Sequence, residues 1–413
     1  MAKLVIGTDK NNTGTASLVR DVSPECYAKF NVSNNEITSW NNFIIPENTI
    51  INISYFLYNG TNPPANFFGP DMETFDALKN VSDIRGAYVL YWFIGTNHKR
   101  NTKLKTVDLS GLVSICGNDS GIHILEYGFA YCDSLVNIKL DKLQKIGGGT
   151  NSNNCYYTFK NCTSLKSVNL SSLKEITGSD VCYGMFYECT ALETVDLSGL
   201  TTISGYNAPF CNVFEKCSKL ISVDLSSLQT IYKGNNMNYA CCSLFKSCTS
   251  LPSMIFPSLE KIGGTNVLKE AFSGCTSLQS ISFPALKEVY PISYTAQFNN
   301  MLSGCTGVTV HFPSNMQAVI GSWSSIINGF GGANTQVLYD LPATDLLTGA
   351  DTNVYSRNPK FDTLTALAWK VGDYGTTDFT PYYTSTTSDP VAGDTLYSDA
   401  SCTTAVTTIS SIA

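Results

Sequence analysis

The chain has 413 residues, of which only 14% are charged, and its formal net charge is −7. Phosphate binding needs clustered Lys and Arg, so this balance argues against a nucleic-acid partner. No apolar run reaches the roughly 18 residues of a membrane span, and the opening MAKLVIGTDKNN shows no signal-peptide core.

Residues 1–70 lack any repeated pattern. They contain short alternations of apolar and polar residues, such as LVIG, YAKFNV and IINISYFLY, between turns rich in Asn, Gly and Pro. An alternation with a period of two is typical of half-buried strands. We therefore expect a small β-rich N-terminal region over residues 1–70.

One pattern recurs through residues 71–341, as in CTSLKSVNLSSLKEITG and CTALETVDLSGLTTISG. Each copy begins at a cysteine and the copies are 27 to 31 residues apart; these anchor cysteines are Cys132, Cys162, Cys189, Cys217, Cys248, Cys275 and Cys305. A degenerate copy, LKTVDLSGLVSI, precedes them. Such self-similarity predicts about eight stacked units that share one continuous core.

Within a unit, the apolar residues keep fixed distances from the anchor cysteine, which we number 0. The +6 and +8 residues, Val168 and Leu170 in one copy, alternate as in a strand, and the aliphatic +14 residue predicts a second extended segment. Upstream, Phe at −3 and an apolar residue at −7 have the spacing of one helix face. Each unit is therefore predicted to contain a short helix and a strand.

The fuller pattern is Phe-x-x-Cys-Thr-Ser-Leu-x-x-Ile-x-Phe-Pro-x-Leu-x-x-Ile-Gly, which residues 272–289 match almost slot for slot. It resembles the BspA-like subclass of leucine-rich repeats, known from bacterial surface proteins and some parasites. The resemblance covers about two thirds of the chain and implies an α/β repeat solenoid with a parallel sheet. The units are longer here than is usual in that subclass, because residues are inserted after position +14.

Two features are expected beyond the last full unit. The segment SNMQAVIGSWSSIINGFGG predicts a capping helix from Ser314 to Gly329, which would cover the open end of the sheet. Residues 342–413 are rich in Thr, Ser, Asp, Tyr and Gly, and their pieces ALAWKV, FTPYYTS and DTLYSD predict a small β module. Residues 383–404 resemble short β modules at the ends of gut bacterial and phage proteins. If the chain forms homo-oligomers, we expect the terminal modules to hold the copies together.

The fifteen cysteines predict buried, reduced thiols rather than a disulfide framework or a metal site. Seven are anchors and Cys155, Cys182 and Cys241 occupy the −7 slot, so they share the inward stripe. There is no Cys-x-x-Cys, and the chain has only three histidines. Because side chains of a stacked ladder point the same way, disulfides between neighbouring units are not expected. We expect no metal and no cofactor.

No catalytic constellation is visible. Gly-x-Ser-x-Gly, a P-loop and a strand-to-helix Gly-x-Gly-x-x-Gly are absent. The acidic residues Asp71, Glu73 and Asp76 have a spacing that fixes no glycosidase geometry, so they are interpreted as a solvated N-terminal cap. The sequence predicts a protein that is not an enzyme.

Two surfaces are candidates for binding. The outward strand positions +5, +7 and +9 are small and polar with a mild acidic row, and this pattern favours a solvated sheet face because aromatic and Arg anchors are missing. The inserted loops concentrate tyrosines among Asn and Gly, which is typical of recognition loops, although packing of the loops is an equal alternative. The candidate binding residues are Tyr156, Tyr157, Tyr183, Tyr206, Tyr239, Tyr290 and Tyr294.

The sequence therefore predicts a non-enzymatic recognition or adhesion protein that contacts a protein or glycan surface. The lack of a visible signal peptide favours a phage virion fibre or receptor-binding component over a secreted protein. A bacterial cell-surface adhesin whose signal peptide has been removed is one alternative. The substrate-binding scaffold of an enzyme is another. The expected location is the virion, or the extracellular side of a cell surface.

Overall fold

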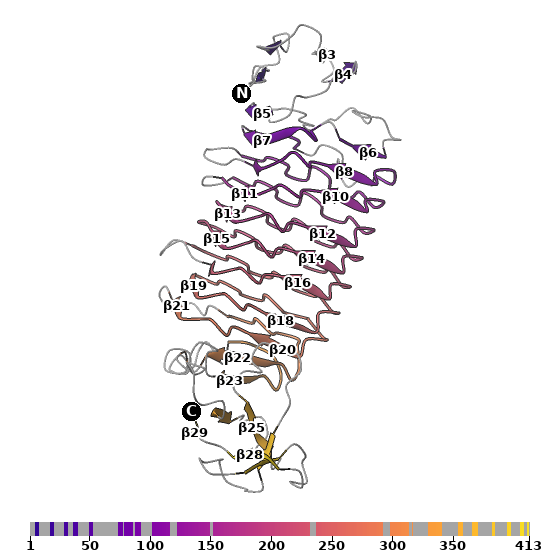
Figure 1. Ribbon diagram of the computed structural model, residues 1–413. Helices are drawn as coiled ribbons and strands as arrows, with labels where there is room; N and C mark the ends of the chain where they lie inside the picture. Colours follow the sequence, from indigo (N-terminus) through magenta and orange to yellow (C-terminus); the bar gives the residue numbers. More distant parts are fainter. Residues whose placement is uncertain are drawn as a thin grey trace.

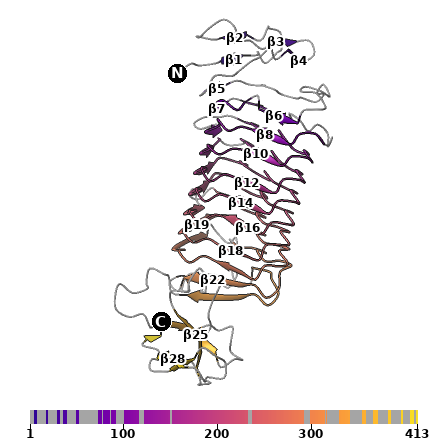
Figure 2. The ribbon, with the colours of Figure 1, turned by 45° about the vertical axis from the view of Figure 1, so that its right-hand side comes forward.

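The computed structural model describes residues 73–76, 78–85, 87–91, 101–115, 122–148, 152–231, 237–291, 298–313, 316 and 329–340, together with the strands assigned outside these ranges. In the repeat region the chain winds into an elongated solenoid, and successive units stack along its axis (Figure 1, Figure 2). Each unit contributes a first strand, a second strand and a run of turns. The stack of repeated units with parallel sheets that the sequence predicts is confirmed.

The first strands form one row along the solenoid, and neighbouring strands in each of its sheets are parallel. Identical slots pair in register, so that Val168 lies beside Val195 and Val195 beside Val223. In the strands at residues 167–169, 194–196 and 222–224 the middle residue is buried and its neighbours face outward, as the alternation predicts. The strands are β6 (Thr74–Phe75), β8 (Thr106–Asp108), β10 (Asn137–Lys139), β12 (Ser167–Asn169), β14 (Thr194–Asp196), β16 (Ser222–Asp224), β18 (Ser253–Ile255), β20 (Ser280–Ser282), β22 (Thr309–Pro313) and β23 (Gln336–Asp340).

The second strands form a continuous nine-stranded parallel sheet. Its aliphatic +14 residues pair in register, as Ile176 does with Ile203. The strands are β5 (Thr49–Asn52), β7 (Val81–Arg85), β9 (Ser114–Ile115), β11 (Lys145–Ile146), β13 (Glu175–Thr177), β15 (Thr202–Ser204), β17 (Thr230–Ile231), β19 (Lys261–Gly264) and β21 (Glu288–Pro291). Strand β5 comes from residues 1–70, so the sheet extends across that predicted boundary. The division at residues 70 and 341 stays a prediction.

The short helix predicted before each first strand is wrong. The segment from −9 to −1 is a run of turns in which residues with positive φ, such as Asn153, Cys155 and Tyr157 at 48°, 57° and 51°, alternate with ordinary ones. Its amides donate to the next unit, as Tyr157 N–H does to the Tyr183 carbonyl at 2.8 Å. A helix about 10 Å across cannot follow strands about 4.8 Å apart without bending the stack. The turn run is narrow enough to stack at the strand spacing.

The core between these elements consists of ladders of identical slots. The −3 phenylalanines stack along the axis with ring centroids 5.2 to 5.9 Å apart, from Phe129 to Phe272. The anchor cysteines are buried, and the Cys189 thiol donates to the Phe159 carbonyl of the preceding unit at 3.1 Å. Among the described residues, ten cysteines are buried and free, which confirms the prediction for the −7 and anchor slots.

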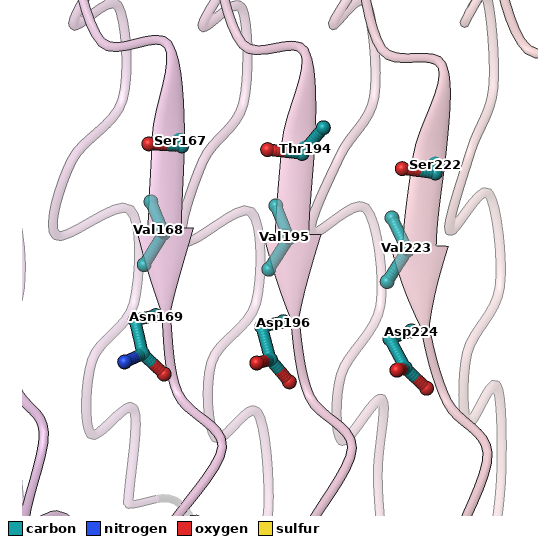
Figure 3. Close-up of a pocket in the computed structure, with 9 residues that line it drawn as sticks. All are labelled: Ser167, Val168, Asn169, Thr194, Val195, Asp196, Ser222, Val223 and Asp224. Carbon is teal, nitrogen blue, oxygen red and sulfur yellow. The ribbon is translucent and has the colours of Figure 1, made fainter.

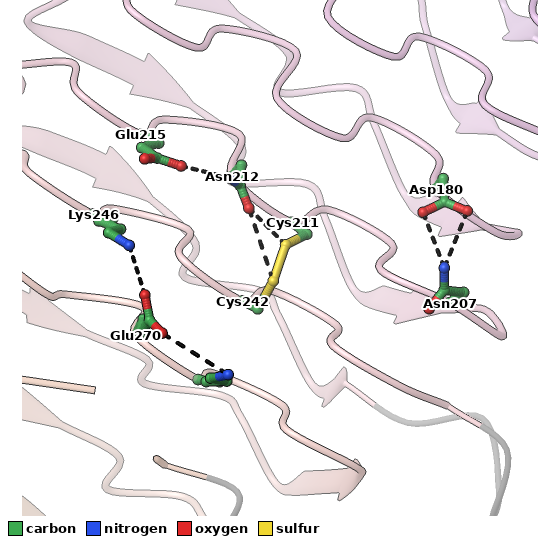
Figure 4. Close-up of a disulfide and its surroundings, with 9 residues drawn as sticks. Asp180, Asn207, Cys211, Asn212, Glu215, Cys242, Lys246 and Glu270 are labelled. Atoms are coloured by element: carbon green, nitrogen blue, oxygen red, sulfur yellow. Dashed lines mark hydrogen bonds and ion pairs between the residues drawn. A yellow bond between two sulfur atoms is a disulfide. The ribbon is translucent and has the colours of Figure 1, made fainter. Parts of the chain in front are cut away.

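One pair of neighbouring cysteines forms a disulfide, contrary to the expectation for stacked units. Cys211 and Cys242 occupy the −6 slot of successive units and are bonded to each other (Figure 4). Their Cα atoms are 4.7 Å apart, which lies within the range that a disulfide can span. The stacking distance therefore favours the bond at the −6 slot, where Cys211 is buried and Cys242 half-buried, beside the free cysteines of the −7 and anchor slots.

The flanking segments contain further strands. β1 (Val5–Gly7) pairs with β2 (Ser17–Val19), and β3 (Lys29–Asn31) pairs with β4 (Glu36–Ser39). Near the C-terminus a six-stranded sheet comprises β24 (Val354–Arg357), β25 (Ala366–Lys370), β26 (Tyr382–Thr384), β27 (Thr395–Tyr397), β28 (Ala405–Thr408) and β29 (Ser411–Ile412). The body of the predicted capping helix at 314–329 lies outside the described residues.

Candidate functional site

Five half-exposed tyrosines gather on the turn runs of three successive units. We call this surface the tyrosine face; it comprises Tyr127, Tyr156, Tyr157, Tyr183 and Tyr187. The alternating turn conformation directs the −7 and −3 residues into the core, whereas the tyrosines at positions −6, −5 and −2 are only partly buried. Five of the nine such positions in these three units are tyrosines, so stacking brings together residues that are about 30 positions apart in the sequence.

Tyr157 lies at the centre of the tyrosine face. Its ring centroid is 4.7 Å from that of Tyr156, 5.2 Å from Tyr127, and 5.5 Å from both Tyr183 and Tyr187. The ring occupies space that the next unit leaves open at its own −5 slot, which is Gly184. A Cβ atom at Gly184 would lie 2.2 Å from Tyr157 Cε1. A missing side chain in one unit thus allows the aromatic ring of its neighbour to lie across it.

Tyr156 and Tyr183 occupy the same slot in successive units and stack on each other. Their centroids are 4.9 Å apart and their planes differ by 12°. Stacking along the axis covers the ring faces that the two residues share and turns ring edges toward solvent. Tyr157 is perpendicular to Tyr156, with an interplanar angle of 89°. The surface therefore combines the ring edges of Tyr156 and Tyr183 with the ring of Tyr157, which is perpendicular to Tyr156.

Two lysines border the tyrosines, and they differ in their partners. Lys216 Nζ is 2.7 Å from Glu188 Oε1 and donates to Tyr187 Oη at 2.8 Å. Lys160 Nζ lies 4.8 Å from the Tyr157 ring centroid, 5.0 Å from Tyr187 and 5.7 Å from Tyr131. Within the described residues, no ion pair involves Lys160. Its ammonium is held by ring quadrupoles instead of a carboxylate.

The electrostatics of the cluster keep its hydroxyl groups protonated. Burial raises the pKa of Tyr156 to about 12, and burial also raises the pKa values of Tyr127, Tyr157 and Tyr183. Burial opposes the ionisation of Glu188, but hydrogen bonds from Lys216 and Asn161 together with nearby positive charge leave its pKa below the usual range. At neutral pH the face therefore presents phenol donors and a Glu188 charge that Lys216 offsets.

The structure brings together only part of the predicted set. Tyr156, Tyr157 and Tyr183 join the tyrosine face, although they lie in the turn runs and not in the inserted loops. Tyr206 and Tyr239 are 42% and 39% exposed and flank the bridge between residues 207 and 238 on successive turns.

The remaining two predicted tyrosines lie elsewhere. Tyr290 belongs to β21, where its hydroxyl donates to Glu288 and Lys261 Nζ lies 4.7 Å from its ring centroid. Tyr294 lies outside the described residues. Tyr127, Tyr187 and Lys160 were missed because their slots were interpreted as helix. Their recurrence at −5 and −2 could have identified them once those slots were recognised as outward.

The competing surface, the outer side of the first strands, forms a shallow recess across β12, β14 and β16 (Figure 3). Its carboxylates already have local partners, since the Ser198 and Ser226 amides donate to Asp196 and Asp224 Oδ1, each at 2.9 Å. These side chains fix the turn after each strand. The recess contains no aromatic anchor; it is lined by Ser167, Val168, Asn169, Thr194, Val195, Asp196, Ser222, Val223 and Asp224.

The described part of the chain offers few other residues that could form a catalytic or metal-binding site. Glu73 pairs with Lys105 at 3.0 Å and Asp76 with Lys79 at 2.8 Å, whereas Asp71 lies outside the described residues. No group of three or more His, Cys, Asp or Glu side chains that could hold a metal ion occurs among the residues that the structure describes. A search of the same residues for a helix long and apolar enough to cross a membrane finds none.

Comparison with known proteins identifies the repeat. The description "BspA type Leucine rich repeat region (6 copies)" matches residues 109–265 and 241–319, which together span about half of the chain. The chain belongs to the BspA-type leucine-rich-repeat family. Repeats of this family typically form protein-interaction scaffolds, in proteins that are typically extracellular or at surfaces.

The other comparisons add little. Among solved structures, the chain is similar to the plant peptide hormone receptor RGFR1 in complex with RGF2, with 15% identity over 70% of this chain and 58% of that chain. The TM-score is 0.15, so this likeness carries no argument about fold or partner. No curated protein matches the chain.

Proposed function

We propose that this BspA-type protein is a non-enzymatic recognition protein that binds a macromolecular partner through the tyrosine face. The observation that carries the proposal is the cluster of half-exposed tyrosines around Tyr157 on an otherwise regular stack. The family supports it, because such repeats typically present a surface to a protein partner. The first-strand recess is the weaker candidate, since its polar groups serve the local turns.

The physical basis is preorganised aromatic area. Tyrosine and its hydroxyl supply a large contact surface with few rotatable bonds, so little conformational entropy is lost on binding. The rings are already fixed by contacts with one another, and the backbone beneath them is hydrogen-bonded from unit to unit, as between Phe159 and Met185 at 2.9 Å. The protonated phenols can donate hydrogen bonds to the partner.

We infer further that the partner is presented on a cell surface. The resemblance of residues 383–404 to end modules of gut bacterial and phage proteins supports a virion fibre or receptor-binding component. A bacterial cell-surface adhesin is the alternative, which the family equally supports. Genes for phage structural proteins beside the coding sequence would favour the first, and genes for surface anchoring would favour the second.

The test compares the parent chain with a variant carrying Tyr156→Ser, Tyr157→Ser and Tyr183→Ser on arrays of purified extracellular proteins and of glycans. The matched control carries Asp196→Asn and Asp224→Asn, because an asparagine at the equivalent Asn169 already caps its turn at 3.0 Å. Circular dichroism monitors folding of all three chains. We expect the parent and the control to bind the same array members and the tyrosine variant to lose at least about tenfold in affinity.

Two outcomes would contradict the proposal. If the Asp-to-Asn control alone lost binding, the site would lie on the first strands. If the folded parent bound no array member at all, the recognition role itself would be rejected.

A further inference from the structure

We propose that Lys160 and the tyrosine rings around it bind a carboxylate side chain in an acidic peptide segment of the partner. The proposal rests on the proposed function, because it assumes that the tyrosine face is the recognition surface. It adds the chemical class of the group that this surface binds. Lys160 is the residue that defines the site. The rings of Tyr131, Tyr157 and Tyr187 all lie within 5.7 Å of its ammonium.

Lys160 is a half-buried cation that has aromatic rings in place of an anionic partner. Elsewhere on the solenoid, lysines pair with carboxylates across neighbouring units, for example Lys145 with Glu175 at 2.9 Å and Lys246 with Glu270 at 2.6 Å. Among the described residues, no such pair involves Lys160. The ring contacts position the ammonium, and its attraction to Glu188 acts from beyond ion-pair distance, so the ammonium remains available to an anion.

The surroundings of Lys160 favour an anion in two further ways. Aromatic rings carry positive electrostatic potential at their edges, and the stacked Tyr156 and Tyr183 turn edges toward solvent. The phenols, whose pKa values are raised by burial, remain donors at neutral pH. Glu188, an acidic group beside this face, is bound to Lys216 at 2.7 Å, which offsets the repulsion that it would exert on an incoming carboxylate.

A peptide fits this arrangement better than a sugar chain. A pyranose ring stacks on an exposed aromatic face, whereas the shared faces of Tyr156 and Tyr183 are covered by each other. An Asp or Glu side chain needs only a cation, hydroxyl donors and ring edges beside its methylene groups. The net charge of −7 over the whole chain would repel an acidic segment from most of the surface, so binding at Lys160 would be selective.

The test measures fluorescence polarisation of a labelled peptide of alternating Glu and Gly, and of its Gln and Gly counterpart, with the full-length chain. Three variants are compared with the parent: Lys160→Gln, Lys160→Arg and Lys166→Gln. Lys166 is an exposed lysine next to β12, so its variant makes the same charge change away from the tyrosine face. A hyaluronate oligosaccharide serves as a competitor that carries carboxylates on a sugar chain.

We expect the parent to bind the acidic peptide and not the neutral one. Lys160→Gln should weaken binding by about tenfold or more, whereas Lys160→Arg and Lys166→Gln should each change it by less than about threefold. Raising the salt concentration from about 50 to about 300 mM should weaken the parent's binding and have little effect on any binding that remains in Lys160→Gln.

Equal binding of the two peptides, or unchanged binding by Lys160→Gln, would overturn the inference. Stronger, Lys160-dependent binding of hyaluronate would also overturn it, because the ligand would then be an acidic glycan. The tyrosine variant separates this inference from the proposed function. If the tyrosine variant loses its array partner while Lys160→Gln keeps it, the tyrosine face remains the binding surface and only the carboxylate assignment fails.

Discussion

At the scale of single residues, the repeat is held by side chains that each serve the neighbouring unit. The anchor thiols donate to the −3 carbonyl of the preceding unit at 3.0 to 3.4 Å, from Cys162 to Cys305. The same slot demands a small, apolar and buried side chain with one donor. Cysteine meets all of these requirements, which explains why it recurs where a leucine or alanine would satisfy only part of them.

The first prediction concerns Cys189→Ala. Removing the thiol takes away one of the two donors to the buried Phe159 carbonyl, which keeps the Cys162 amide at 3.3 Å, and opens a small void, so we expect a loss of about 1 to 2 kcal/mol in the free energy of unfolding. Urea denaturation of the variant and of Thr190→Ala, an exposed neighbour, measures the difference. Equal denaturation midpoints for the two variants would mean that the thiol contact contributes nothing.

A second prediction compares Leu197→Asp with Asp196→Ala. Leu197 is fully buried, so an unpaired carboxylate there should destabilise the protein by at least about 3 kcal/mol. Asp196 faces outward and accepts from the Ser198 amide at 2.9 Å, so its loss should be limited to about 1 kcal/mol. Thermal denaturation distinguishes them, and similar midpoints would show that the strand register differs by one residue.

At the scale of elements, strands and their register were predictable from the sequence, whereas the turn run was not. The apolar residues at +6 and +8 identified the first strand, because an alternation with a period of two over so short a segment indicates a half-buried strand. The −7, −3 and 0 spacing satisfies both a helix and a stacked turn run, and only the spacing between units decides between them. For the same reason Tyr156 and Tyr157 were predicted as loop residues, and Lys160 was not predicted at all.

A third prediction tests how neighbouring turn runs shape the tyrosine face. Gly184→Ala places a Cβ against Tyr157 and should displace that ring, so near-ultraviolet circular dichroism of tyrosine should change and binding of the array partner should weaken by about tenfold. The control is Gly307→Ala, which has a similar positive φ of 70° but no heavy atom within 4 Å of the new Cβ. Both variants should lose about 1 kcal/mol through the left-handed backbone. If they have identical spectra and binding, the Gly184 gap does not position Tyr157.

At the scale of the whole molecule, stability is the sum of similar interfaces between units, and the core is unusually rich in ionisable groups held neutral. Burial raises the pKa of Cys275 to about 12, and it raises the pKa values of Cys162, Cys217 and Cys248 well above the usual value of 9.0. Because the folded pKa values exceed those of the unfolded chain, the fold favours the neutral thiols. Their contribution is complete below about pH 9 and declines as the pH rises toward the folded values.

The fourth prediction is therefore a steep alkaline limit. The thermal midpoint should fall progressively between about pH 9 and about pH 12, and the tyrosines of the tyrosine face should add to the decline, since burial raises the pKa of Tyr156 to about 12. Differential scanning calorimetry across this range measures the effect, under conditions that keep the free thiols reduced and the Cys211–Cys242 disulfide intact. A midpoint that stays constant up to about pH 11 would show that the thiols are accessible to solvent when folded.

The disulfide also determines how the molecule responds to mechanical force. A chain pulled from its two ends lengthens by peeling units from the stack, and each freed residue adds about 3.4 Å of contour. Cys211 and Cys242 are 31 residues apart in sequence, so the loop between them cannot extend while the bond is intact. The bond therefore shortens the contour length of the pulled chain by about 105 Å. The Cys211 carbonyl accepts from the Gly184 amide at 2.8 Å, so the loop begins beside the tyrosine face, and under tension the units next to that face are tied together by a covalent bond that pulling alone does not open.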